Sequence, residues 1–136
     1  MKIAVDRVSP FFWGVTLFAW MSVIFLLSSL PGSENIFEPT LFYLLERKGA
    51  HIIEYAVLMF VATRFTLALF PDLVFKRVVF FSAIFSLLYA ASDEWHQSFV
   101  PYRGAKVSDV AIDGLGILLT ASILLVAWYQ HQQKKI

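Results

Sequence analysis

Apolar residues gather in four long runs along the chain, with shorter polar segments between them. The runs cover residues 11–30, 50–70, 74–91 and 110–129. Each is about 20 residues long, the length of an α-helix that crosses the hydrocarbon core of a bilayer. Because a backbone in hydrocarbon must satisfy its polar groups internally, each run is predicted to be a helix. The sequence therefore predicts an all-α polytopic membrane protein, a bundle of four transmembrane helices.

The segments between the runs carry residues that end helices or turn the chain. Pro31-Gly32 follows the first run and Pro71 follows the second, and both are typical helix stops. Only residues 71–76 join the second and third runs, so these two helices are predicted to form an antiparallel hairpin. Residues 35–47 mix apolar and acidic residues, which favours an interfacial helix between the first two spans, with a packed loop as the alternative. Without a repeat or a linker, residues 1–136 are predicted to form a single membrane domain.

Composition agrees with a membrane location and excludes several classes of site. Hydrophobic residues make up 59% of the chain and charged residues 15%, and the mean hydropathy is +0.70. The formal net charge is only +1 and the basic residues are scattered, which argues against nucleic-acid partners. The chain has no cysteine, so disulfides, thiolate metal sites and thiol nucleophiles are excluded. Any chemistry must use oxygen and imidazole groups.

Basic residues near the ends of the runs indicate the orientation of the chain. The side that holds both termini carries more of them, namely Lys2, Arg7, Lys76, Arg77, Lys134 and Lys135, with Arg64 close enough to snorkel there. Since cytoplasmic loops carry the excess of Lys and Arg, both termini are predicted to be cytoplasmic. The first run is longer than the apolar part of a cleavable leader, so it is predicted to remain as the first span.

Ionisable and polar residues concentrate at the opposite, outward ends of the second, third and fourth runs. They follow a spacing of three or four, which places each set on one face of a helix. The sets are Lys48, His51 and Tyr55 in the second run, Asp93 and Gln97 flanked by Glu94 in the third, and Asp109 and Asp113 followed by Gly116 in the fourth. A charge at the bilayer centre costs about 2.5–3.5 kcal/mol on insertion scales, so these groups are expected to face one another. We therefore expect a polar vestibule between three helices.

Individual members of this set also have structural interpretations. These are interfacial anchoring for Lys48, Glu54 and Lys106, a place in the aromatic belt for Tyr55, exposure to water for His96, and a structural ion-pair network for Asp93, Arg103 and Asp109. Because intramembrane charge is costly and so much of it converges here, a functional site is the preferred interpretation of the last group.

The polar residues also form four motifs in a fixed order at helix ends: Lys48-x-x-His51-x-x-x-Tyr55, Ser92-Asp93-Glu94-x-x-Gln97, Pro101-x-Arg103 and Asp109-x-x-x-Asp113-x-x-Gly116. In these motifs and in its four-helix layout the chain resembles VanZ-like membrane proteins over nearly its whole length. The resemblance implies a bacterial inner-membrane protein, of a family named for a member that gives low-level resistance to the glycopeptide teicoplanin. It also implies a relationship to membrane enzymes that act on lipid head groups or lipid-linked cell-wall intermediates.

The resemblance carries the family's polar positions onto six residues, namely His51, Asp93, Glu94, Gln97, Arg103 and Asp109. Asp113 stands where the family pattern has Asn. An extra carboxylate there offers a metal ligand and a negative charge, whereas Asn could only form hydrogen bonds.

The preferred hypothesis is an enzyme that hydrolyses or transfers the phosphate head group of a lipid or lipid-linked cell-envelope precursor at the outer face. Arg103 would clamp phosphate oxygens, with positive charge added by Lys48. His51 would act as general acid, general base or nucleophile, oriented by Asp93 or Asp109. The predicted catalytic residues are His51, Asp93, Glu94 and Asp109, and the predicted substrate-binding residues are Lys48, Tyr55, Gln97, Arg103 and Asp113.

Other mechanisms stay open at this point. A divalent cation could bind the carboxylates and His51, but the spacing lacks the density of a zinc motif, so no metal or other cofactor is assigned. A protein that binds or shields a lipid-linked precursor or an antibiotic without turnover is the first alternative function. A proton-coupled carrier is the second, although the cytoplasmic half offers little polar path beyond Arg64, Thr63 and Thr66.

Overall fold

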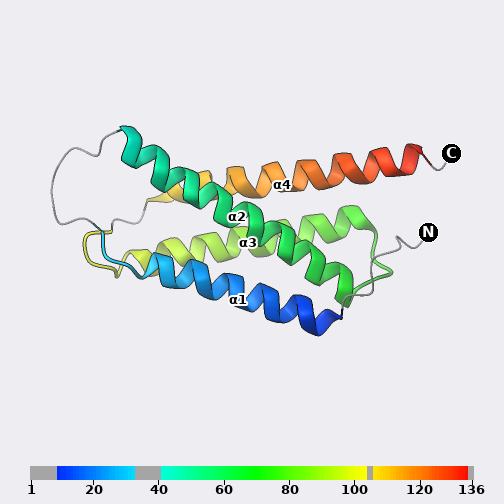
Figure 1. Ribbon diagram of the computed structural model, residues 1–136, viewed down its shortest axis with the longest axis horizontal. Coiled ribbons are helices and arrows are strands. Elements are labelled where there is room, and N and C mark those ends of the chain that lie inside the picture. Colours follow the sequence, from blue (N-terminus) through cyan, green and yellow to red (C-terminus); the bar gives the residue numbers. More distant parts are fainter. Residues whose placement is uncertain (1–8, 33–40, 104–105, 135–136) are drawn as a thin grey trace.

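Four α-helices run along the molecule, as Figure 1 shows for a computed structural model of the chain. They are α1 (Pro10–Ser28), α2 (Leu41–Leu69), α3 (Phe75–Gln97) and α4 (Val107–Gln133). The structure describes residues 9–32, 41–103 and 106–134, without the side chains of 41–47. Within these residues there are no strands, and all four helices contain a stretch long and apolar enough to cross a membrane. The prediction of an all-helical, four-span protein is confirmed.

The helices begin and end where capping residues and prolines require it. At the start of α1 the hydroxyl of Ser9 accepts the backbone N–H of Phe11 at 3.2 Å, and Pro10 occupies the first helical position. The helix stops before Pro31, and α2 stops before Pro71, as predicted. A turn closed by the bond from Leu73 N to Phe70 O then leads into α3, so α2 and α3 form the expected hairpin.

Three helices extend further into polar sequence than the apolar runs indicated. The third run ends at residue 91, but α3 continues to Gln97, and α4 begins at Val107 rather than at residue 110. Residues 41–47, part of the predicted interfacial helix, continue directly into α2, and residues 35–40 of that prediction lie outside the described residues. Backbone hydrogen bonds hold these turns whatever the side chains are, so hydropathy alone marks the membrane part of a helix and not its end.

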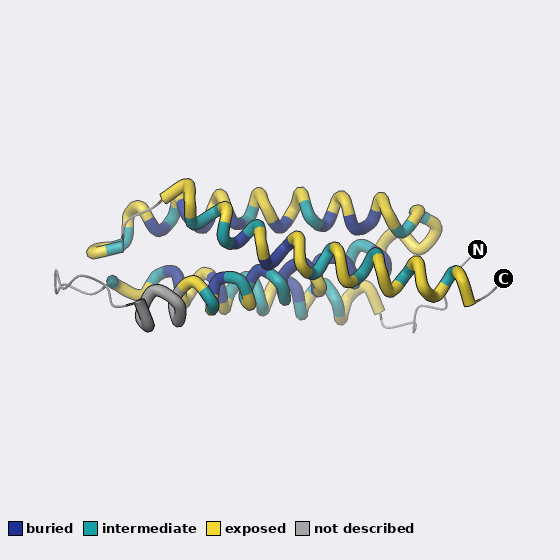
Figure 2. Tube along the Cα trace, turned by 90° about the horizontal axis from the view of Figure 1, so that it is seen from above, coloured by how far each residue is buried: buried dark blue, intermediate teal, exposed yellow. Residues whose placement is uncertain are grey.

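Helix α2 lies at the centre of the packing, because it contacts α1, α3 and α4. Figure 2 shows the buried positions along the inward faces of the helices and the exposed ones on the outside. The buried apolar core comes from all four helices and includes Ile24, Tyr55, Leu58, Val79 and Ile117. Large exposed apolar side chains, such as Phe18, Leu88 and Leu118, cover the outside, as expected for surface that faces lipid.

Helix α4 approaches α2 closely at Gly116. A Cβ atom built at Gly116 would overlap the carbonyl oxygen of Ile52 and lie 3.1 Å from the backbone nitrogen of Ala56. One turn further along α4, the hydroxyl of Thr120 donates to the carbonyl oxygen of Ala56 at 3.1 Å. The small residue therefore sets the distance between the two helices, in the way that glycine does at membrane helix contacts.

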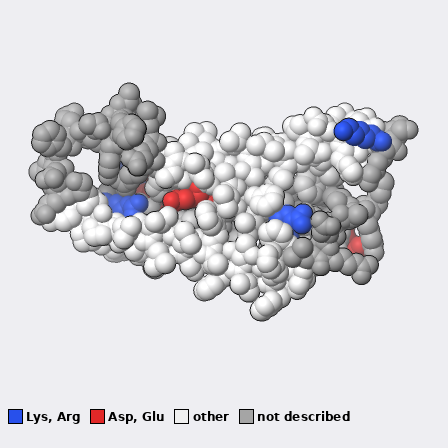
Figure 3. All heavy atoms as spheres, viewed as in Figure 1, with Lys and Arg blue, Asp and Glu red and all other residues white. Residues whose placement is uncertain are grey.

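Charged groups gather at the ends of the bundle. The start of α1 and the end of α4 lie at one end, and the ends of α1 and α3 meet the starts of α2 and α4 at the other, which we call the site end (Figure 1). Most of the surface visible in Figure 3 is uncharged, and an acidic and a basic patch lie near each other toward the site end. Near the opposite end, the guanidinium of Arg64 lies 4.9 Å from the ring centroid of Trp13, a cation–π contact inside the span.

Candidate functional site

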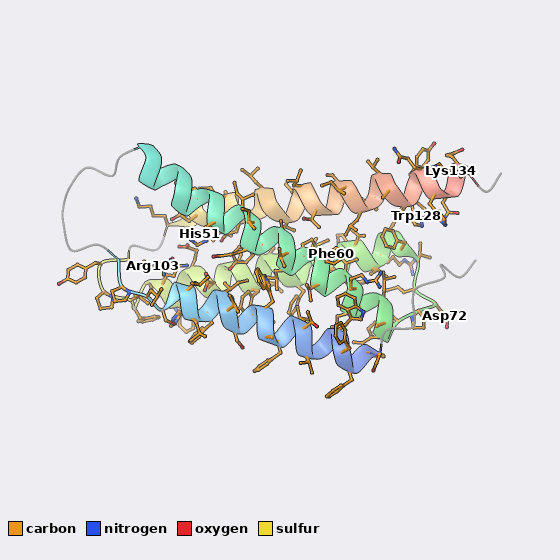
Figure 4. The ribbon with its side chains drawn as sticks, in the orientation of Figure 1. His51, Phe60, Asp72, Arg103, Trp128 and Lys134 are labelled. Carbon is orange, nitrogen blue, oxygen red and sulfur yellow. The ribbon has the colours of Figure 1, made fainter. Side chains whose placement is uncertain are left out.

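The site end brings together the polar residues of α2, α3 and α4. Figure 4 shows His51 on α2 and Arg103 in the connection after α3 at this end, far from Asp72, Trp128 and Lys134 at the other. His51, Asp93 and Asp113 are 8%, 4% and 0% exposed, so three different helices each bury an ionisable side chain here. The structure brings polar side chains of these three helices together, and α1 adds Ser28 to them.

A histidine and an aspartate form the centre of the site. Nδ1 of His51 on α2 lies 3.2 Å from Oδ1 of Asp113 on α4, and both side chains are buried. The expected orienting partners of His51 were Asp93 or Asp109, whereas the structure places the carboxylate of Asp113 against the ring. The close approach of α4 at Gly116, one helical turn after Asp113, makes this pairing geometrically accessible.

Asp93 on α3 is held by α1 as well as by its own helix. Its Oδ2 accepts hydrogen bonds from the hydroxyl of Ser28 and from Nε2 of Gln97, both at 2.8 Å. Ser28 and Gln97 are themselves buried, with relative exposures of 2% and 0%. Two donors fix the position of this carboxylate, so Asp93 ties the end of α1 to the site and also contributes negative charge near His51.

Several buried polar atoms of this cluster have no hydrogen-bond partner among the described residues. They include Tyr55 Oη, Glu94 Oε1, Gln97 Oε1 and both carboxylate oxygens of Asp113. His51 Nδ1 is also among them, because its 3.2 Å contact with Asp113 Oδ1 has an ion-pair distance without the alignment of a hydrogen bond. The other oxygen of Glu94 accepts the backbone N–H of Lys106 at 2.9 Å. Burying polar groups without partners is costly, and native proteins satisfy nearly all of them. A cluster of such atoms therefore favours a place where a polar ligand or water binds.

Arg103 fastens the connection after α3 to the end of α1. Its Nη1 donates to the carbonyl oxygens of Leu27 and Leu30, which lie at the C-terminal end of α1 where helical carbonyls lack backbone partners. Next to it, Gly32 N donates to Pro101 O at 3.0 Å, and a Cβ at Gly32 would overlap the carbonyl oxygen of Tyr102. These contacts differ from the predicted phosphate clamp and assign Nη1 of Arg103 to positioning α1.

Replacing Arg103 with methionine should destabilise the site end, because the apolar stem stays while the donors to Leu27 and Leu30 are lost. Hydrogen bonds from a charged group contribute about 1.5–3 kcal/mol, so the free energy of unfolding in detergent should fall by about that amount. Arg77→Met, at an exposed position near the other end, is the matched control and should change it little. Equal stabilities of the two variants would contradict this role.

The remaining predicted residues lie at the rim of the site. Lys48 is exposed, one turn before His51, and Asp109 is half-buried in the first turn of α4, where its carboxylate accepts from Ser108 Oγ at 3.3 Å. A carboxylate in the first turn is favourable beside the positive end of the helix dipole. Tyr55 is fully buried in the core, so it does not belong to an aromatic belt.

The comparisons with known proteins agree with this layout. The model of the VanZ/LLP1 family matches residues 13–128, which include parts of all four spans and every predicted site residue. The chain belongs to the VanZ/LLP1 family. No curated protein and no solved structure matches it.

In this VanZ/LLP1 chain, α1 supplies site residues that the sequence interpretation missed. Ser28 donates to Asp93, and Ser29 Oγ lies 3.0 Å from Nε2 of His96, whose ring packs against Phe25. His96 therefore packs against α1 rather than standing exposed in water. In the sequence, two serines precede Pro31 at the same membrane depth as the other polar residues. They could have indicated that the first helix joins the site, but hydropathy does not show which helices are neighbours.

The carboxylates of this VanZ/LLP1 protein do not form a compact metal centre in the part of the chain that the structure describes. Within these residues no group of three or more His, Asp or Glu side chains is arranged to hold a metal ion. His51 and Asp113 form a pair, while Asp93 is occupied by Ser28 and Gln97. The arrangement supports proton transfer at a positioned imidazole, with carboxylates that fix the ring and the neighbouring helices.

Proposed function

We propose that the chain is a membrane enzyme that hydrolyses or transfers the phosphate head group of a lipid or lipid-linked cell-envelope precursor. The observation that carries the proposal is the buried contact of His51 Nδ1 with Asp113 Oδ1 at 3.2 Å, inside a membrane-spanning bundle and beside buried oxygens without partners. The part of the chain that matches the VanZ/LLP1 family, residues 13–128, includes both residues, and the resemblance to that family implies chemistry on lipid head groups. Because inserting an ionisable group into a membrane is costly, ionisable groups inside a membrane domain usually have a function.

The 3.2 Å contact between His51 and Asp113 is close enough for the carboxylate to orient the imidazole as a general base. A carboxylate at Nδ1 fixes the ring and stabilises the imidazolium that forms, which leaves Nε2 to exchange a proton with the substrate. In hydrolysis, Nε2 of His51 takes a proton from water as the water oxygen bonds to phosphorus. The bond from phosphorus to the leaving oxygen breaks, and the imidazolium returns the proton to that oxygen. In transfer, an acceptor hydroxyl replaces the water.

Positive charge for the phosphate comes from the rim of the site. Lys48 is exposed one turn before His51, and Lys106 stands at the start of α4, also exposed. Ammonium groups in these positions neutralise charge that develops on phosphate oxygens during transfer. Arg103 acts on the same site by holding α1 and therefore Ser28 in place.

The proposal can be tested by incubating the purified protein with a total lipid extract of bacterial membranes, so that no single substrate has to be chosen in advance. The expected result is release of a water-soluble phosphate compound, or a new lipid, that depends on time and on protein concentration. A protein that only binds or shields a lipid would retain it intact, and this outcome would contradict the enzymatic proposal.

We also propose that the protein lies in the bacterial inner membrane with both termini in the cytoplasm, so that the site end faces outward. The chain has no cysteine, which makes single-cysteine labelling free of background. In intact spheroplasts a membrane-impermeant maleimide should label Tyr102→Cys and should reach Lys134→Cys only after lysis, since the two residues are exposed at opposite ends. The reverse pattern would contradict the orientation that the basic residues predict.

A further inference from the structure

A groove on the outer surface between α3 and α4 is lined at one end by Glu94, a residue of the site. Its volume is about 750 Å³, in the range of small-molecule pockets. Its polar residues, Glu94, Ser98 and Lys106, come from the end of α3 and the start of α4. The rest of its lining is apolar or small and includes Leu87, Ala91, Val110, Ala111, Gly114 and Leu118.

The length of the groove matches one leaflet of a bilayer. Along α4 its lining runs from Val107 to Leu118, which corresponds to about 16 Å at a rise of 1.5 Å per residue. The hydrocarbon core of a bilayer is about 30 Å thick, so one leaflet occupies about half of it. A groove that is polar at the helix ends and apolar for the depth of one leaflet has the polarity order of a single lipid molecule.

Glu94 connects the groove with the catalytic pair. It lines the groove, is 5% exposed, and lies within electrostatic range of His51 and Asp113. Its Oε2 accepts the backbone N–H of Lys106 at 2.9 Å, while its Oε1 is buried without a donor among the described residues. Because Glu94 lines the groove, a ligand bound there can supply the N–H or O–H donor that this oxygen lacks once the side chain turns toward it.

We infer that the groove binds a membrane phospholipid whose head group carries an ammonium next to the phosphate, as in phosphatidylethanolamine. The chain would lie along Ala111, Gly114 and Leu118, the phosphate beside Lys106, and an N–H of the ammonium against Oε1 of Glu94. The opposite charges of Glu94 and Lys106 at the head-group end match the opposite charges of this head group. The inference rests on the proposed function, because it names the class of lipid that this site receives.

Native mass spectrometry of the full-length protein in detergent tests this with two probes, dioleoyl-phosphatidylethanolamine and dioleoyl-phosphatidylcholine. The two lipids have the same chains and net charge, but the choline nitrogen has no N–H. A hydrogen bond between charged groups corresponds to about a tenfold difference in retention, in favour of phosphatidylethanolamine. Equal retention of the two lipids by the unchanged protein would overturn the inference without any variant.

Two variants locate the contact. In Glu94→Gln the amide oxygen must keep accepting the N–H of Lys106, so an NH2 group replaces the free oxygen and the preference for phosphatidylethanolamine should disappear. Ala111→Phe should fill the groove and reduce retention of both lipids, whereas Ala127→Phe, an exposed position on the same helix outside the groove, should not. If Ala111→Phe retains both lipids as well as the unchanged protein does, the lipid does not bind in the groove. If the unchanged protein is a dimer and Ala111→Phe is a monomer, the groove is occupied by a second copy of the chain.

Failure of this inference differs from failure of the proposed function. If the protein retains phosphatidylethanolamine selectively but forms no product, the proposed lipid site stands and the proposed enzymatic activity is contradicted. If the protein turns over lipid without a preference for a head-group ammonium, the proposed enzymatic activity stands and the proposed contact of Glu94 with the ammonium is overturned.

Discussion

Replacing His51 with alanine should reduce lipid turnover by about 10²–10⁴-fold, the range that a positioned general acid or base contributes. In the proposed mechanism the imidazole of His51 stands between Asp113 and the substrate. Product release from a membrane lipid extract, measured over a fixed time with equal amounts of folded protein, checks this. The effect should fall on the maximal rate, because His51 exchanges a proton in the reaction rather than holding the lipid chain.

Two further variants separate chemistry from folding. His51→Gln keeps a side chain that can donate to the buried carboxylate of Asp113 but cannot transfer a proton, so it should fold and remain inactive. His96→Ala is the matched control, since this second histidine at the site end packs against Phe25 and Ser29 of α1. Full activity of His51→Gln would remove His51 from the mechanism.

Replacing Gly116 with alanine should separate α2 from α4, lower the stability of the protein and abolish activity. The added Cβ overlaps the carbonyl oxygen of Ile52, which is backbone and cannot rotate away. Overpacking of this kind costs about 1–3 kcal/mol, measured as the free energy of unfolding in detergent. Because Ile52 follows His51 and Asp113 lies one turn before Gly116, any separation at this contact also pulls apart the catalytic pair.

Gly114→Ala provides a control on the same helix. A Cβ there meets nothing within 4 Å, so this variant should keep its stability or gain some from the higher helix propensity of alanine, by about 1 kcal/mol or less. Equal stability of Gly116→Ala and Gly114→Ala would show that the close approach of α4 to α2 does not hold the site together.

The fold follows from the sequence because a bilayer leaves few choices. Four runs of about 20 apolar residues must be helices, and Pro31 and Pro71 mark where two of them stop. The ends of α3 and α4 were harder to predict, since Asp93, Glu94 and Gln97 are polar yet lie in helix. Their side chains are satisfied or buried by neighbouring helices, and a hydropathy pattern carries no information about neighbours.

The burial of the polar side chains was easier to predict than their pairing. Spacing of three and four placed His51, Asp93 and Asp113 on inward faces, and the structure buries all three. Which carboxylate meets His51 depends on the rotation of α4 about its axis, and a close contact at Gly116 sets that rotation. The role of Arg103 at α1 depends on the path of a connection, which spacing along a helix cannot supply.

An experimental structure of the protein in nanodiscs made from its native lipids would show directly whether a lipid phosphate reaches His51. We predict a lipid in the groove between α3 and α4, with its phosphate within about 3 Å of a ring nitrogen of His51 or of the attacking water that His51 holds. Lipids found only around the outer surface, with His51, Asp113 and Glu94 closed off by protein contacts alone, would contradict it.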